Sequence, residues 1–332
     1  MTATSTTETA AARPAANRVR TLIARYGVLA AIVLTFITFS VLRPDSFLNS
    51  LTLLGILRDC VPLMVLALGI TVVMTLGQFD MSVGGLTSLM AVVSVIFVST
   101  TYVGLPVPLA VLLTLVIGAL LGLVNGIAVA YVKLSAFIFT IAMSTVFTGI
   151  GLQLTNSQSL FTGVPPEYVA IASGSVFGVS NQTFIGLAVL VVLHILMIHT
   201  QPGRFMYAIG GNREAARLAG VPVQALLATG FAVAGIAAAL SGVLLTSQAG
   251  ASNPSTGIGL LLPAYAAVFL GSSLSRNALV TPVGTAIGAL FLQMIGSGLT
   301  LLNLSGPLVS IIQGLILVGA ILLSRVAKKD AS

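Results

Sequence analysis

Two long stretches of the chain consist of apolar and small polar residues and contain no charged side chain. One runs from Met81 to Val132 over 52 residues, and the other runs from Leu218 to Ser275 over 58 residues. A helix of roughly 20 apolar residues crosses the hydrocarbon layer of a membrane, which is about 30 Å thick. Each stretch is therefore long enough for two spanning helices, and the pattern predicts a protein that crosses a membrane several times.

The remaining apolar segments complete the predicted set of helices. We expect two spans in Asn277–Ser324 and one span in each of four segments: Tyr26–Leu42, Cys60–Phe79, Leu134–Pro166 and Tyr168–Gly203. A polar loop rich in Ser, Asn and Gly, Thr155–Gln182, lies between the last two of these spans. With the two long stretches, this gives an all-α polytopic fold of ten transmembrane helices.

The Lys and Arg residues lie almost entirely on one predicted side of the membrane. With the N-terminus inside, only Arg43 and Arg58 of the 14 cationic residues fall in outer segments. This distribution follows the positive-inside rule, and an even number of spans returns the C-terminus to the cytoplasm. We expect a disordered cytoplasmic tail at residues 1–24, a transmembrane domain at 25–325 and a second cytoplasmic tail at 326–332.

The composition agrees with a membrane protein and excludes two other classes. Hydrophobic residues make up 57% of the chain, charged residues 6%, and the mean hydropathy is +1.12. These values are far from those of a soluble globular domain. The net charge of +7 indicates the cytoplasmic face and attraction to anionic membrane lipid. Nucleic-acid binding is not expected, because no basic soluble domain is present, and no cleavable signal peptide is apparent.

The sequence offers no set of residues typical of an enzyme or a metal centre. Cys60 is the only cysteine. His194 and His199 are five positions apart, which would place them on different faces of an α-helix, so we expect no metal site from them. No Ser/His/Asp set, paired carboxylates or phosphate-binding loop is apparent. We therefore predict no catalytic residue in this chain.

The two halves of the chain resemble each other weakly. Aligning Gly118–Ser144 with Gly288–Gly314 gives seven identities in 27 positions. The alignment places Lys133, on the predicted inner side, opposite Asn303 on the outer side. An inverted duplication under the positive-inside rule would produce this asymmetry. The sequence thus favours an inverted repeat, and the alternative is two ordinary glycine-rich packing faces.

Two predicted helix interruptions occupy corresponding places in these halves. Ser82–Leu86 and Thr256–Leu260 both contain glycine and enter the membrane from opposite sides. Paired interruptions of this kind point to the substrate path in transporters.

The longest predicted cytoplasmic connection runs from Gln201 to Pro222. Gly210 and Gly211 interrupt the chain, and Asn212 is a suitable N-cap for a short helix, Arg213–Leu218. Gly220 follows where a C-terminal glycine cap belongs. A short capped helix with a small face, Ala215 and Ala216, suits docking into a groove on a partner, and the alternative is a plain basic connector.

Three segments carry motifs that match a known family. Gly77-Gln-Phe-Asp-Met-Ser-Val-Gly-Gly85 is similar to a Gly-Ile-Asp-Leu-Ser-Val-Gly block, and Gly122-Leu-Val-Asn-Gly126 lies ahead of Lys133-Leu-Ser-Ala-Phe-Ile-Phe-Thr140. The third segment is 203–220. Over about residues 25–325 the chain resembles the permease subunits of ribose-type ATP-binding-cassette importers, a family that includes xylose, arabinose, galactoside and autoinducer-2 permeases.

The resemblance implies a type II importer-like permease in the bacterial inner membrane, paired with a second copy or a paralogue. Its partners would be a cytoplasmic ATPase, which holds ATP and Mg, and an extracytoplasmic sugar-binding protein. This chain itself would hold no cofactor. The segment 203–221 would couple it to the ATPase through eight residues: Gly211, Asn212, Arg213, Glu214, Ala215, Ala216, Arg217 and Gly220.

The predicted substrate path follows from the few polar groups at membrane depth. Arg58 and Asp59 are expected at one mouth and Asp80 at the other. Because no Arg or Lys is expected in the middle of the membrane, a neutral monosaccharide or polyol fits better than an anion. The candidate path or gate residues are Phe79, Asp80, Ser82, Asn125 and Tyr265.

Asp80 has two open roles: it could cap the next helix through the amides of Ser82 and Val83, or contact the substrate or a gate. Since the chain has no Trp, stacking on a sugar would fall to Phe79, Phe147 or Tyr265.

Two departures from the family pattern argue against ribose in particular. Gln78-Phe79 replaces a Gly-Ile pair, and Leu262-Pro263 replaces the Glu-Leu of many sugar permeases. One alternative function is a branched-chain amino-acid permease of the same superfamily. Another is a stand-alone secondary transporter, which would need acidic or His relays deep in the spans, and Asp80 alone is a poor relay.

Overall fold

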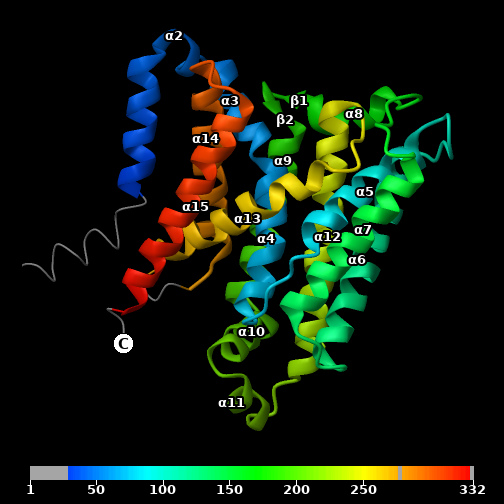
Figure 1. Ribbon diagram of the computed structural model, residues 1–332, viewed down its shortest axis with the longest axis vertical. Coiled ribbons are helices and arrows are strands. Elements are labelled where there is room, and N and C mark those ends of the chain that lie inside the picture. Colours follow the sequence, from blue (N-terminus) through cyan, green and yellow to red (C-terminus); the bar gives the residue numbers. More distant parts are fainter. Residues whose placement is uncertain (1–28, 276–278, 330–332) are drawn as a thin grey trace, which may run out of the picture.

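The computed structural model describes residues 29–275 and 279–329 (Figure 1). Seven of its helices are long and apolar enough to cross a membrane: Ser50–Thr75, Val107–Ala130, Ala136–Thr155, Asn181–His199, Val223–Ala249, Thr256–Ser273 and Pro282–Leu301. Three shorter apolar helices lie at Leu29–Leu42, Val83–Val98 and Gly306–Leu315. The chain is therefore an all-α polytopic membrane protein.

After the helix Leu29–Leu42, the elements follow in chain order. They are α2 (Pro44–Phe47), α3 (Ser50–Asp59), α4 (Val61–Thr75), α5 (Val83–Val98), α6 (Val107–Ala130), α7 (Ala136–Thr155), α8 (Pro166–Ser173), β1 (Ser175–Val176), β2 (Val179–Ser180), α9 (Asn181–His194), the π-helix η1 (Ile195–His199), α10 (Gln201–Gly211), α11 (Arg213–Leu218), α12 (Val223–Ala249), α13 (Thr256–Ser273), α14 (Pro282–Leu301) and α15 (Gly306–Lys329). The strands β1 and β2 form a small antiparallel hairpin. The expected polar loop Thr155–Gln182 thus contains α8 and this hairpin.

The centre of the bundle is formed by α4 and α12. Almost every residue of α4 is buried, against α9, α12, α13 and α14. In contrast, most residues of α6, α7 and α9 are partly or fully exposed. In a membrane protein, such exposed apolar faces contact lipid or another spanning subunit.

The expected span Cys60–Phe79 is displaced towards the N-terminus. Helices α3 and α4 run together as one 26-residue helix, Ser50–Thr75. Pro62 has no N–H to donate to the Arg58 carbonyl one turn earlier, and Gln182 Nε2 donates to that carbonyl at 2.8 Å instead. Arg58 and Asp59, expected just before the span, therefore lie within this helix. Their place at one mouth of the path stays a prediction.

Two interrupted helices meet inside the protein. Helix α5 begins only at Val83, after an irregular segment, and α13 begins at Thr256. The Gly257 N–H donates a hydrogen bond to Ser88 Oγ over 2.9 Å. A Cβ atom on Gly257 would lie 2.6 Å from the Gly84 carbonyl oxygen, so the two helix starts cross at a pair of glycines. The two predicted interruptions thus lie side by side.

The two ends of the bundle differ in structure. Helices α10 and α11 project beyond the bundle at one end, whereas α2, α8 and the β1–β2 hairpin lie at the other (Figure 1). The break expected at Gly210 and Gly211 falls at the second glycine, because α10 continues through Gly210 and ends at Gly211. The tail 1–24 lies outside the described residues, and α15 continues to Lys329.

Candidate translocation and coupling sites

The irregular segment before α5 is built around the carboxylate of Asp80. Asp80 Oδ1 accepts hydrogen bonds from the Ser82 backbone N–H at 2.9 Å and from Ser82 Oγ at 2.5 Å. The residue is 1% exposed. The carboxylate therefore holds the turn that leads into α5 through Ser82, and no hydrogen bond to Val83 is found in the described structure. Of the two roles open to Asp80, this geometry favours the structural one.

Side chains from three other helices hold the same segment. The Tyr265 hydroxyl on α13 accepts from the Asp80 N–H at 2.9 Å and donates to the Asp80 carbonyl at 3.0 Å. Thr140 Oγ1 on α7 accepts from the Met81 N–H, and Asn125 Nδ2 on α6 donates to Ser82 Oγ. Four of the five candidate path residues therefore form one buried polar cluster.

The fifth candidate, Phe79, lies over this cluster. Its ring stacks on that of Tyr265 with centroids 6.0 Å apart and remains 40% exposed. Phe147, another candidate for stacking on a sugar, is buried. Of the three aromatic candidates, Phe79 is therefore the one whose ring a solute can reach.

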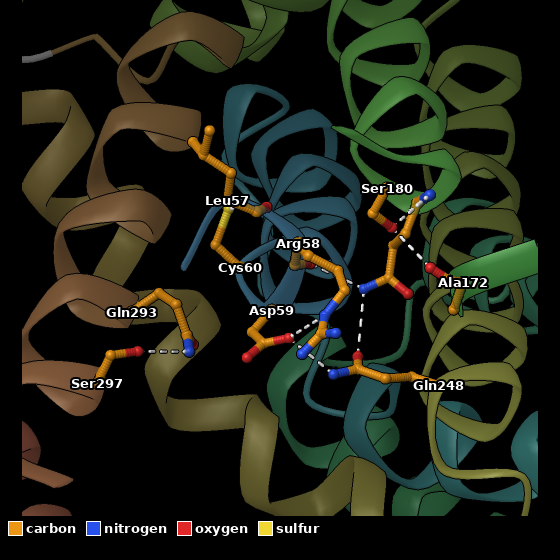
Figure 2. Close-up of polar contacts among 10 residues, drawn as sticks. Leu57, Arg58, Asp59, Cys60, Ala172, Ser180, Gln248, Gln293 and Ser297 are labelled. Atoms are coloured by element: carbon orange, nitrogen blue, oxygen red, sulfur yellow. Dashed lines mark hydrogen bonds and ion pairs between the residues drawn. The ribbon is translucent and has the colours of Figure 1, made fainter. Parts of the chain in front are cut away.

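A second polar site surrounds the Arg58–Asp59 pair, which the sequence places at one mouth of the path, and its other residues were not singled out from the sequence (Figure 2). Asp59 Oδ1 accepts from Arg58 Nε at 2.7 Å and from Gln248 Nε2 at 2.8 Å. Gln182 Nε2 donates to the Arg58 carbonyl and, over 3.3 Å, to Gln248 Oε1. This network joins α3, α9 and α12 inside the bundle.

Asp59 and Gln248 open onto a large cavity of about 640 Å³, whose wall combines polar and apolar residues. Its wall also includes Asn253, Gln293 and Gln313, from the start of α13 and from α14 and α15. The volume lies within the range of small-molecule sites. One signal in the sequence could have indicated this cavity: glutamines at 248, 293 and 313 interrupt otherwise apolar helices.

The helix α11 has the bounds and caps that the sequence predicts. Asn212 Oδ1 accepts from the Ala215 N–H at 3.0 Å, which is an N-cap, and Gly220 has a φ of +81°. Ala216 packs inward into the hydrophobic core, while Ala215 stays exposed. The expected docking face of Ala215 and Ala216 is therefore corrected, since only Ala215 is available to a partner. Leu218 is 76% exposed and was not singled out from the sequence.

The remaining residues of this segment serve α11 or connect it to the bundle. Arg217 donates two hydrogen bonds to Glu214 on the surface, and these lower the pKa of the Glu214 carboxyl. Arg213 and Gly211 are exposed. Gly210 on α10 packs directly against the Thr75 carbonyl, next to Gly77. Helix α10 thus touches the end of α4 at the start of the segment that contains Asp80.

Helix α10 also reaches the other half of the bundle. The Tyr207 hydroxyl donates to the Val280 carbonyl over 2.9 Å, just before α14. Helix α10 therefore contacts the chain at two separate places, between α4 and α5 and just before α14.

The histidine pair is closer than the sequence suggests. The π-helix η1 adds a residue to the turn and brings the rings of His194 and His199 to a centroid distance of 5.7 Å. The expectation that they lie on different faces is therefore wrong, because it assumed α-helical spacing. No group of three or more His, Cys, Asp or Glu residues that could hold a metal occurs in the part of the chain that the structure describes.

Comparison with known proteins places this arrangement in a family. The sequence model of a family described as "branched-chain amino acid transport system / permease component" matches residues 52–321, which is most of the chain. The chain belongs to this permease family. No solved structure gives a significant match to the permease.

Curated relatives of the permease match it over nearly its whole length. The ribose import permease of Haemophilus influenzae is 33% identical over 306 residues, 91% of this chain and 93% of the relative. The L-arabinose permease of an ABC transporter from Azospirillum brasilense is 30% identical over 324 residues, 97% and 94% of the two chains. An autoinducer 2 import permease of Escherichia coli is 32% identical over 293 residues, 88% and 84% of the two chains. The resemblance to ribose-type importer permeases is confirmed.

Proposed function

We propose that this chain is the membrane-spanning subunit of an ATP-driven importer that carries a neutral sugar or polyol across the bacterial inner membrane. One observation carries the proposal: full-length relatives named as ribose, arabinose and autoinducer 2 permeases match across both halves of the bundle. The cavity beside Asp59 supports the substrate class. Its glutamine and asparagine amides donate to and accept from hydroxyl groups without adding charge.

The family description names branched-chain amino acids, which keeps that class as an alternative. An amino acid would need a site for its ammonium and carboxylate groups and an apolar pocket for its side chain. Arg58 and Asp59 are bonded to each other, so neither offers a free charge of full strength. Together with the names of the relatives, this favours the sugar class.

The ten-span topology with both termini in the cytoplasm belongs to the same proposal. Seven span-length helices and three shorter apolar ones in the described residues support ten spans, with the second span displaced from Cys60–Phe79 to Ser50–Thr75. Under this topology α10 and α11 face the cytoplasm, and α8 and the hairpin face outwards.

An inverted repeat would relate α4–α7 to α12–α15. Three helix contacts recur under this exchange. The α5–α7 contact corresponds to α13–α15, the α5–α12 contact to α13–α4, and the α6–α12 contact to α14–α4. Lys133 and Asn303, which the sequence alignment places opposite each other, both have left-handed backbone, with φ values of 63° and 59°. Left-handed backbone is uncommon outside glycine, so its recurrence at matched turns supports a common origin.

Energy coupling would run from α11 through α10. The exposed face of α11, with Ala215 and Leu218, would seat in a groove of a cytoplasmic ATPase that binds ATP and Mg. Movement of α10 would then reach the Thr75–Gly77 turn and Val280, two of the points at which α10 contacts the bundle. The segment of Phe79 and Asp80, which follows directly, would be the part of the path that responds.

The remaining partners follow from the importer architecture. A second copy or a paralogue would complete the translocation path, and an extracytoplasmic binding protein would deliver the sugar. Membrane lipid would cover the apolar faces of α6, α7 and α9 that the partner leaves open. The chain would hold no cofactor and catalyse no reaction of its own.

The decisive experiment is uptake into proteoliposomes that contain the permease, its ATPase and its binding protein. We expect ATP-dependent uptake of a labelled pentose or pentitol and little uptake of a sugar phosphate. Uptake of leucine in place of any sugar would favour the amino-acid alternative. Sugar uptake by the permease alone, driven by an ion gradient, would make it a secondary transporter.

Topology is tested by single cysteines in a Cys60→Ala background. Glu167→Cys, on α8, should react with an impermeant thiol reagent from outside intact cells, and Arg213→Cys, on α11, only after the cells are opened. Equal labelling of both positions from outside would contradict the proposed orientation.

The coupling helix is tested at its exposed small residue. Ala215→Arg should prevent seating in the ATPase groove and lower binding-protein-stimulated ATP hydrolysis and co-purification of the ATPase, whereas Ala215→Ser should retain both. Because Ala215 is exposed, neither change should alter folding of the isolated permease. Normal coupling in Ala215→Arg would mean that α11 is not the docking element.

A further inference from the structure

The Arg58–Asp59 pair is unusual because it lies well inside a span-length helix. It is separated from the start of that helix at Ser50 by about two turns, or roughly 12 Å at 1.5 Å per residue. Ionisable groups at such a position are expensive and commonly mark a functional path. Neither group is fully buried, since the side chains are 39% and 33% exposed. The exposed part of Asp59 faces the polar cavity, whose wall it helps to form.

The carboxylate of Asp59 retains capacity to accept further hydrogen bonds. Oδ1 takes both of the observed donors, Arg58 Nε and Gln248 Nε2, and Oδ2 has no donor among the residues that the structure describes. A carboxylate offers about four acceptor positions, so roughly half of them remain for a ligand. Asp59 differs from a purely structural ion-pair partner because Oδ1 is held by the protein while Oδ2 is left free for a ligand.

Amide side chains from separate helices surround the same cavity. Figure 2 shows Asp59 between Gln248 of α12 on one side and Gln293 of α14 on the other. Gln293 makes only a long 3.3 Å contact with Ser297. Each of these amides has N–H and carbonyl groups left over, which is the donor and acceptor mixture that matches the hydroxyl groups of a sugar or polyol.

We propose that the permease itself binds its cargo in this cavity, with Asp59, Gln248 and Gln293 as hydrogen-bond partners of a neutral polyhydroxylated solute. This site rests on the proposed function and goes beyond it, because it gives the membrane subunit a recognition step of its own. Arg58 holds the carboxylate in place and offsets part of its charge. An anionic solute is disfavoured because it would meet the remaining negative charge of Asp59.

Solute binding is tested without transport by protecting a cysteine on the cavity wall. Ser159 lines the cavity, is exposed, and differs from cysteine by one atom. The full-length Ser159→Cys permease, in a Cys60→Ala background and reconstituted in lipid nanodiscs, is labelled with a maleimide. Millimolar D-ribose, L-arabinose or ribitol should slow the labelling, and D-gluconate at equal concentration should not. The matched reporter Glu167→Cys lies outside the cavity wall, and its labelling should not change with any solute.

The role of the carboxylate is tested in the same assay. Asp59→Asn keeps the shape of the side chain and removes its charge, and the concentration that gives half protection should rise about tenfold, equivalent to about 1.4 kcal/mol. Asp45→Asn, an exposed acid on α2, is the matched control and should leave protection unchanged. A side chain with only a structural role would not shift solute protection in a permease that still reacts normally without solute.

The outcomes separate this proposal from the proposed function. If ATP-driven sugar uptake occurs but no neutral solute protects Ser159→Cys, the cavity is not a binding site and the importer function stands. If a solute protects the Asp59→Asn variant at the same concentration as the native residue, the proposed role of Asp59 as a hydrogen-bond partner is overturned. If protection is seen as expected but the complete complex transports no sugar, the site is upheld and the importer function is overturned.

Discussion

Asp80 and Asp59 are both acids within the apolar bundle, but their surroundings differ. Asp80 is 1% exposed, and hydrogen bonds from its own segment and from three neighbouring helices fix the surrounding turn. The Asp59 side chain is 33% exposed and bonded through one oxygen, beside a cavity lined with amides. The first acid is used by the fold, and the second is left open to a solute.

This contrast shows why an acid in an apolar helix does not identify a substrate contact by itself. A buried carboxylate must be satisfied, and the protein can do so with its own donors, as Ser82 does for Asp80. The informative feature is how many hydrogen-bond acceptor positions remain on the carboxylate once the protein's own donors are counted. By this measure Asp59 has more to offer a ligand than Asp80, although the sequence motif drew attention to Asp80.

The largest expected effect that tests this contrast is the loss of stability in Asp80→Ala. The change leaves the Ser82 N–H and hydroxyl without their acceptor in a buried turn, which should lower the free energy of unfolding by about 3 kcal/mol. The midpoint of thermal unfolding would be measured by heating the detergent-solubilised permease and following the fraction that stays monodisperse in size-exclusion chromatography. Asp59→Ala should lower the free energy of unfolding by less than half as much, because the partners of Asp59 reach water in the cavity. An equal loss in both variants would remove the distinction between the two acids.

A smaller loss is expected for Tyr265→Phe. The variant keeps the ring stacked on Phe79 and removes the hydroxyl that bonds the Asp80 N–H and carbonyl, at a cost of about 2 kcal/mol. The same thermal assay applies, with Tyr102→Phe as the control because Tyr102 is exposed. An unchanged midpoint in Tyr265→Phe would mean that the segment around Asp80 is not held from α13.

Local signals predicted some of these features well. The N-cap at Asn212 and the glycine at 220 gave the bounds of α11 correctly, because capping depends on residues adjacent in sequence. The motif residues around Asp80 also gave four members of one buried cluster. These residues come together from distant parts of the chain, since Asp80 and Tyr265 are 185 positions apart. In the sequence, only the family resemblance and the paired helix interruptions indicated that they would meet.

Other features escaped because the sequence rules assume independent elements. Dividing the chain at charged residues put Arg58 and Asp59 before a span, whereas the span-length helix includes both. There the two side chains bond each other, and Gln248 also donates to Asp59. The spacing of His194 and His199 was read with α-helical geometry, and a π-helix changes that geometry without any clear sign in the sequence. Ala216 was assigned to a partner because the tertiary contact that buries it is not visible from the helix alone.

A modest effect, confined to one element, is expected for Asn212→Ala. The N-cap bond to the Ala215 N–H contributes about 1 kcal/mol to α11, which is too short to be stable without its caps and contacts. Hydrogen exchange of the α11 amides should therefore become faster, with the midpoint of the whole permease unchanged. If exchange in α11 stays the same, the cap is not what limits opening of this helix.

The smallest effect is expected for an acid that lies in water, Glu214, which completes the series from buried to open to exposed. Hydrogen bonds from Arg217 lower the pKa of Glu214, so its contribution to stability is complete above the ordinary pKa of a glutamate and is lost as the pH falls through the lower pKa of the folded state. Since both side chains are exposed, water and salt screen the pair, and Glu214→Gln should leave the unfolding midpoint unchanged at neutral pH. The measurement compares α11 hydrogen exchange in the native permease and in Glu214→Gln at several pH values and two salt concentrations. We expect a slight difference at neutral pH and low salt that disappears on acidification and at high salt. A large difference at neutral pH would show that the exposed acid contributes as much as the buried one, and burial would then not be what separates Asp80 from the other two.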